Sequence, residues 1–133
     1  MKSLYLVACM VAISATVWAQ DGQRVALPDD YRNTFAKFPM VNRQMNPDQL
    51  GILYANAAAL TGISTGKFPS GSVMLFEIYK AKKDANGNVL TEADGMRVPA
   101  GHALTAVMEK RDGWGADIPE AIRNGDWLSL IHI

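Results

Sequence analysis

The stretch that decides the fold runs from Ser72 to Lys82 and reads Ser72-Val73-Met74-Leu75-Phe76-Glu77-Ile78-Tyr79-Lys80-Ala81-Lys82. In a β-strand, alternate side chains point to opposite faces. One face of this stretch then carries Val73, Leu75, Glu77 and Tyr79, and the other carries Met74, Phe76, Ile78 and Lys80. Both faces begin apolar, which predicts a central strand that is covered on both sides.

Two further strands flank this one in the sequence. The residues from Leu50 to Ala55 are rich in β-branched and aromatic side chains, and Gly101 to Arg111 alternate in the same way. Asn56 is a good cap for a short helix that ends near Leu60. The alanine content also leaves open a single helix over 47–60, because alanine is the best helix former.

Turn signals separate these elements. Gly66 to Gly71 contains glycine, proline and serine, and Asp84 to Asn88 contains Asn-Gly, the strongest short hairpin signal. We expect a short helix from Asp29 to Lys37, and one helical turn within Asp117 to Arg123. The whole pattern predicts an α+β domain, mainly an antiparallel β-sheet with short flanking helices.

The composition indicates one globular domain. The chain has 133 residues, of which 49% are hydrophobic and 20% charged, with zero formal net charge. No electrostatic attraction toward a polyanion follows from this balance, so we expect no nucleic-acid partner.

The first 19 residues have the three parts of a secretory signal peptide. Lys2 is followed by an apolar run from Leu4 to Trp18, and Val17 and Ala19 suit a cleavage site after Ala19. The run is shorter than the roughly 20 residues of a membrane span, so we expect no stable span in the mature, periplasmic or secreted protein.

Lipidation at Cys9 is the alternative to cleavage after Ala19, since Leu6 to Cys9 fits a lipoprotein motif. Cys9 is the only cysteine, so a mature chain without it forms no disulfide and no thiolate metal site.

Four features are candidates for chemistry. Glu77, on a covered strand, would have a raised pKa and is a weak candidate for a catalytic proton donor. Met74, Phe76 and Ile78 form an apolar stripe that is either core or the wall of a pocket for a flat apolar cofactor. His102 lacks the partners of a metal site, so we expect a strand-edge or hydrogen-bonded histidine and no metal. The G-x-S-x-G pattern at Gly62 to Gly66 lacks the preceding strand that a nucleophile elbow needs, so we interpret it as a flexible turn.

Several motifs in order resemble one family. They are Leu27-Pro28-Asp29-Asp30-Tyr31-Arg32, Ile52-Leu53-Tyr54-Ala55-Asn56, Gly66-Lys67-Phe68-Pro69-Ser70-Gly71-Ser72-Val73, Val107-Met108-Glu109-Lys110 and Gly125-Asp126-Trp127. This set, from Leu27 to Trp127, resembles the cytochrome P-460 family and its relative cytochrome c′-beta. The resemblance implies a periplasmic homodimer with haem c attached at a C-terminal Cys-x-x-Cys-His, whose histidine is the proximal ligand. It also implies either oxidation of hydroxylamine or binding of gases such as nitric oxide, with a possible redox partner.

The sequence departs from that family pattern in two places. It contains no Cys-x-x-Cys-His, so no haem is attachable in this chain as given. Residues 128–133 match the translation of a transposase adaptor used in sequencing libraries. We therefore interpret 20–127 as an incomplete domain and 128–133 as an artefact.

The second departure is Phe76, which stands where the hydroxylamine-oxidising members carry a lysine that cross-links to the haem. This favours a protein that binds small nitrogen ligands such as nitric oxide. A hydroxylamine or nitric oxide oxidoreductase that uses Glu77 as proton acceptor and a haem-free envelope binding module are the alternatives.

Overall fold

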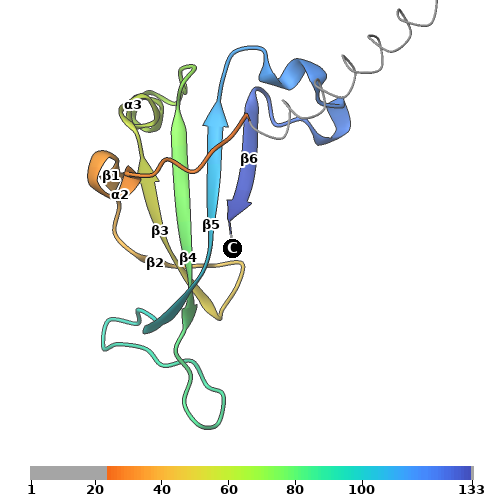
Figure 1. The fold of residues 1–133 in the computed structure, drawn as a ribbon. Coiled ribbons are helices and arrows are strands. Elements are labelled where there is room, and N and C mark those ends of the chain that lie inside the picture. The colour runs from red at the N-terminus through yellow and green to blue at the C-terminus, as the bar shows by residue number, and fades with distance from the viewer. Residues whose placement is uncertain (1–23, 133) are drawn as a thin grey trace, which may run out of the picture.

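The fold is one antiparallel sheet, seen in a computed structural model that describes residues 24–132 (Figure 1). Its strands lie in the order β1-β3-β4-β5-β6, and β2 also pairs with β3. The elements are α2 (Tyr31–Thr34), β1 (Ala36–Lys37), β2 (Val41–Asn42), β3 (Gln49–Ala55), α3 (Ala57–Thr65), β4 (Val73–Ala81), β5 (Pro99–Lys110), η1 (Trp114–Asp117), η2 (Glu120–Ile122) and β6 (Trp127–His132). The predicted α+β class with a mainly antiparallel sheet is confirmed.

Strand β4 is central, as its alternation predicts. It pairs with β3 on one side from Met74 to Lys80 and with β5 on the other from Val73 to Ala81, with irregular register after Ile78 in the pairing with β5. At its midpoint Glu77 lies opposite Ile52 and Thr105, and Phe76 lies opposite Leu53 and Ala106. Residues opposite each other in antiparallel strands share a face, so these two rows define the two faces of the sheet.

The first described residues cover one face of the sheet. This N-terminal strap, residues 24–35, crosses the sheet from β6 toward α2 (Figure 1). It contributes Val25 and Tyr31 to the hydrophobic core, which contains Leu75 and Val107 at 0% exposure. Burial of these apolar side chains is the main favourable term in the stability of the fold.

Helix α3 contacts β3 and β4 at one end of the sheet. It begins at Asn56, which caps it as predicted, and ends at Gly66, whose φ of 78° is the left-handed conformation that favours glycine. The helix runs five residues past the predicted end at Leu60. The alternative of a single helix over 47–60 is wrong, because Gln49–Ala55 form β3.

Two other predicted helices differ from the structure. The helix predicted over 29–37 is a single turn, α2, because Phe35 is extended and Ala36–Lys37 pair with β3 as β1. The turn predicted within 117–123 is divided between the 3-10 helices η1 and η2. The Asn-Gly hairpin is confirmed, with Gly87 at φ 83° and a bridge between Lys83 and Val89.

The proposed signal peptide lies outside the described residues. Among residues 24–132, no helix has both the length and the apolar character that crossing a bilayer requires. Residues 128–132, which we interpret as foreign to the domain, form most of β6 and pair with β5. Their origin stays a prediction.

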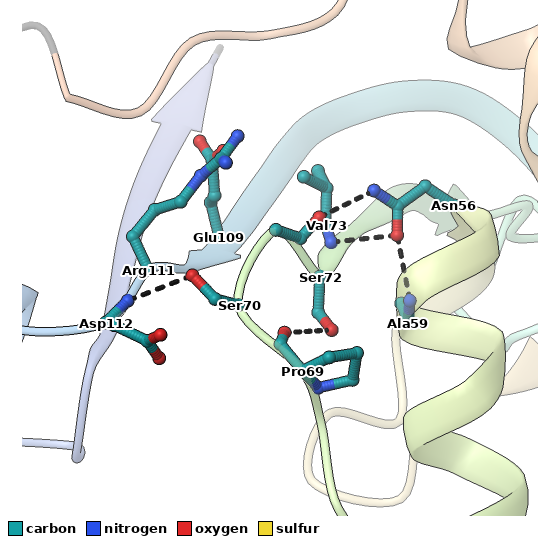
Figure 2. A network of polar contacts seen from close by, with 10 residues as sticks. Asn56, Ala59, Pro69, Ser70, Ser72, Val73, Glu109, Arg111 and Asp112 are labelled. Carbon is teal, nitrogen blue, oxygen red and sulfur yellow. Dashed lines mark hydrogen bonds and ion pairs between the residues drawn. The ribbon is translucent and has the colours of Figure 1, made fainter.

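A polar network fixes the turn before β4 (Figure 2). The Asn56 Oδ1 atom accepts hydrogen bonds from the backbone amides of Ala59, at 2.9 Å, and of Val73, at 3.1 Å. Its Nδ2 donates to the carbonyl of Gly71 at 2.9 Å. On the far side of the turn, the Ser70 Oγ accepts from the amide of Asp112 at 3.0 Å. One side chain therefore joins α3, the turn and β4.

Asn56→Ala should lower the free energy of unfolding by about 2 kcal/mol, because it removes a helix cap and two further hydrogen bonds. Asn56→Asp keeps both acceptor contacts and loses the donor, so it should cost about half as much. Urea unfolding followed by circular dichroism measures both. Asn86→Ala, on the exposed hairpin, is the control, and equal midpoints for the Asn56 and Asn86 variants would contradict this role.

Candidate functional site

Glu77 lies on the strap side of β4 and is 1% exposed. Its carboxylate accepts hydrogen bonds from the hydroxyls of Tyr31 and, at 2.8 Å, Tyr79. Arg32 donates through Nε at 2.8 Å and forms an ion pair through Nη2 at 2.6 Å. The Tyr54 hydroxyl is 3.5 Å away, so all three tyrosines of the described residues surround one carboxylate. We call Glu77 with Tyr31, Arg32, Tyr54 and Tyr79 the carboxylate cluster.

The expected burial of Glu77 is confirmed, but the expected direction of its pKa is wrong. Burial by itself raises the pKa of Glu77, and the hydrogen bonds from Tyr31, Tyr79 and Arg32, with the Arg32 charge, lower it further than burial raises it. The net result is a pKa below the ordinary value, so Glu77 is ionised near neutral pH. Burial and the bond to Glu77 raise the pKa of Tyr31 to about 12.

The apolar stripe lies on the opposite face. Met74, Phe76 and Ile78 alternate with the residues of the carboxylate cluster along β4, so the strand itself separates them from Glu77. Ile78 is buried, whereas Met74 and Phe76 are half-buried. Half-buried apolar residues on neighbouring strands extend the surface around Met74 and Phe76, and we call the whole set the apolar face: Leu53, Met74, Phe76, Leu104, Ala106 and Met108.

Phe76 lies directly on the backbone of β3. A Cβ atom at Gly51 would stand 2.0 Å from the Phe76 Cζ atom, so the ring occupies the space that a side chain would need. On the ring lies the guanidinium of Arg43, whose Cζ atom is 5.9 Å from the ring centroid. Gly51 and Arg43 are therefore both neighbours of the Phe76 ring. The sequence pattern named Phe76 but missed the other two; a glycine within a β-rich run is the signal that could have shown the close approach.

The remaining candidates are ordinary structural residues. The His102 Nε2 atom is 2.8 Å from the Thr105 hydroxyl, and its ring meets Tyr79 edge to face, which confirms a hydrogen-bonded strand histidine. The interpretation of Gly62 to Gly66 as a flexible turn is wrong, because α3 continues to Thr65 and only Gly66 lies beyond it. Ser64 lies exposed within this helix and donates to the carbonyl of Thr61, so it is not in a nucleophile elbow. In the described part of the chain, no group of three metal-ligating side chains lies together.

Glu77→Gln should lower the free energy of unfolding at about pH 7 by about 1–3 kcal/mol, because the charged acceptor of three donors is lost. The cost stays below that of a fully buried pair, since the Arg32 side chain is 62% exposed and water can solvate it. The folded-state pKa of Glu77 is lowered, so its stabilisation is present above the ordinary pKa and disappears as pH falls through the folded value.

Urea unfolding of wild type and Glu77→Gln between about pH 7 and about pH 3 measures this. The difference between the two proteins should shrink toward acid pH. Glu92→Gln, at an exposed position of the loop after β4, is the control and should follow the wild type throughout. A difference between wild type and Glu77→Gln that does not change with pH would contradict the assignment.

Tyr31→Phe should cost about 1–2 kcal/mol, because a buried hydrogen bond to a charged group is lost. The folded-state pKa of Tyr31 is raised from 10.0 to about 12, so its stabilisation is complete below pH 10 and is lost as pH rises toward 12. The pKa values of Tyr54 and Tyr79 are raised as well, by burial and by Glu77, so absorbance titration should show several tyrosines ionising late. Tyr31→Phe should remove one tyrosine's share of the absorbance change at the highest pH. Tyr54→Phe, which loses only the 3.5 Å contact, should destabilise less.

The comparison with protein families identifies the domain. The model of the family described as Cytochrome P460 matches residues 28–131, which is most of the chain. No curated protein matches the chain significantly. The expected resemblance is thus confirmed at the level of the family, and its residues include β4, the carboxylate cluster and the apolar face. The chain belongs to the cytochrome P-460 family, which is a family of haem proteins.

Proposed function

We propose that the complete protein is an exported haem c protein that binds nitric oxide or a related small nitrogen ligand over the apolar face. The observation that carries this proposal is Phe76. It stands where the resemblance expects a cross-linking lysine in members that oxidise hydroxylamine, and the structure places its ring on the apolar face.

The described residues fit one wall of a haem site but not its attachment. The apolar face offers half-buried aliphatic, thioether and aromatic side chains on three adjacent strands, which suit a flat apolar ring system. Residues 24–132 contain no cysteine, and the one cysteine of the sequence is Cys9. We propose that a Cys-x-x-Cys-His in the native gene follows Trp127 and supplies the thioether bonds and the proximal histidine. Residues 128–133 would then be foreign to it.

When bound, the haem would supply an iron that coordinates a small ligand. The contribution of this chain is the environment of that ligand. Met74 and Phe76 carry no hydrogen-bond donor or acceptor that stabilises bound water or an anion, apart from the weakly accepting thioether. Such a surface favours a small neutral ligand over water.

The oxidoreductase alternative requires a proton acceptor beside the ligand. Glu77 was the only candidate, and it lies on the opposite face with its carboxylate already bound by Tyr31, Arg32 and Tyr79. None of the six residues of the apolar face has a side chain that accepts a proton, so ligand binding is the better-supported function.

The haem-free alternative is decided by whether the native gene encodes Cys-x-x-Cys-His. Export and a homodimer of the complete protein are parts of the same proposal.

Phe76→Asn in the complete, haem-loaded protein should weaken nitric oxide binding about tenfold, because a polar amide at this position holds water that the ligand must displace. Phe76→Leu keeps the apolar wall and should bind within about twofold of wild type. Spectroscopic titration with nitric oxide measures both. A red-shifted haem spectrum of the cross-linked kind, or a native gene that continues without Cys-x-x-Cys-His, would contradict the proposal.

A further inference from the structure

Arg43 is the only basic side chain that contacts an aromatic ring of the apolar face in the described part of the chain. It follows β2, which pairs with the outer edge of β3, and its guanidinium lies over the Phe76 ring. The backbone at Arg43 is held in place, because the Arg97 Nη1 atom donates to the Arg43 carbonyl at 2.9 Å and also to the carbonyls of Asn46 and Gln49. Its guanidinium is therefore held at one side of the apolar face.

The charge of Arg43 has no carboxylate partner among residues 24–132. The ion pairs of that part of the chain join other residues: Arg24 with Asp117, Arg32 with Glu77, Lys83 with Asp48, and Arg111 with Glu109. The Arg43 guanidinium donates through Nη1 to the amide oxygen of Gln49, a neutral acceptor. A guanidinium has five N–H donors, so most of them are available to a ligand.

We propose that Arg43 binds a carboxylate of the flat ligand that lies on the apolar face, namely a propionate of an iron porphyrin. This assignment rests on the proposed function, which places a haem on that face. A porphyrin joins an apolar ring system to two carboxylates, and the structure places an apolar surface beside an arginine that has no carboxylate partner among the described residues. Guanidinium and carboxylate match in geometry and form strong, charge-assisted hydrogen bonds. The side chain of Gln49 accepts one hydrogen bond from the guanidinium and helps to hold its orientation.

The test compares two probes on the purified chain, without covalent attachment. One probe is iron(III) protoporphyrin IX, which has free propionates, and the other is its dimethyl ester. Arg43→Gln should weaken binding of the first probe about tenfold, which corresponds to about 1.4 kcal/mol, and leave binding of the ester within about twofold. Phe76→Asp should weaken both probes, because it removes the shared apolar contact. Arg123→Gln is the control, since Arg123 donates to the carbonyl of Ile118, outside the apolar face.

Absorbance titrations give the dissociation constants, and circular dichroism confirms that each variant is folded. Equal losses for both probes in Arg43→Gln, or no loss for either, would overturn the role of Arg43 while leaving porphyrin binding intact. If the unsubstituted chain binds neither probe, the assignment of a porphyrin to this face is overturned as well. The proposed function has its own separate test in the sequence that follows Trp127 in the native gene.

Discussion

A buried carboxylate on the central strand is the constraint on which the rest of the structure depends. Glu77 is 1% exposed, and an ionised group at that depth is stable only if donors surround it. Tyr79 is on the same strand, but Tyr31 and Arg32 lie 46 and 45 residues before Glu77 in the sequence. The hydrogen bonds from Tyr31 and Arg32 to Glu77 therefore hold the N-terminal strap across one face of the sheet. The apolar contacts of Val25 and Tyr31 complete that side of the core.

The side chains of β4 alternate between the two faces of the sheet, so the residues of the core and those of the proposed ligand surface lie on different faces. On the strap side of β4, Val73, Leu75 and Glu77 are buried, and with Tyr79 they contribute to the core and to the carboxylate cluster. Residues one position away point to the other face, where Met74 and Phe76 are only half-buried. A neighbouring pair such as Phe76 and Glu77 thus serves two different tasks although the two residues are adjacent in the sequence.

Local patterns in the sequence predicted what depends on neighbours along the chain. The central position of β4, the strand before Asn56, its helix cap and the Asn-Gly turn all follow from periodicity and turn chemistry. The pKa of Glu77 could not be predicted, because its sign depends on donors that only the folded chain brings together. The contact of Arg43 with Phe76 is long-range for the same reason. The short α2 reflects pairing of Ala36–Lys37 with β3, which outweighs local helix preference.

The close approach of the Phe76 ring to Gly51 also constrains how this family can diverge. The ring fills the volume above β3 that any larger residue at position 51 would occupy. A side chain at position 76 that points away from β3 would release that volume, whereas the Phe76 ring as it lies here occupies it. Positions 51 and 76 should therefore covary among relatives, with glycine at the first accompanying an aromatic residue at the second. A glycine at position 51 would then mark, in sequence alone, the relatives that share this flat apolar surface.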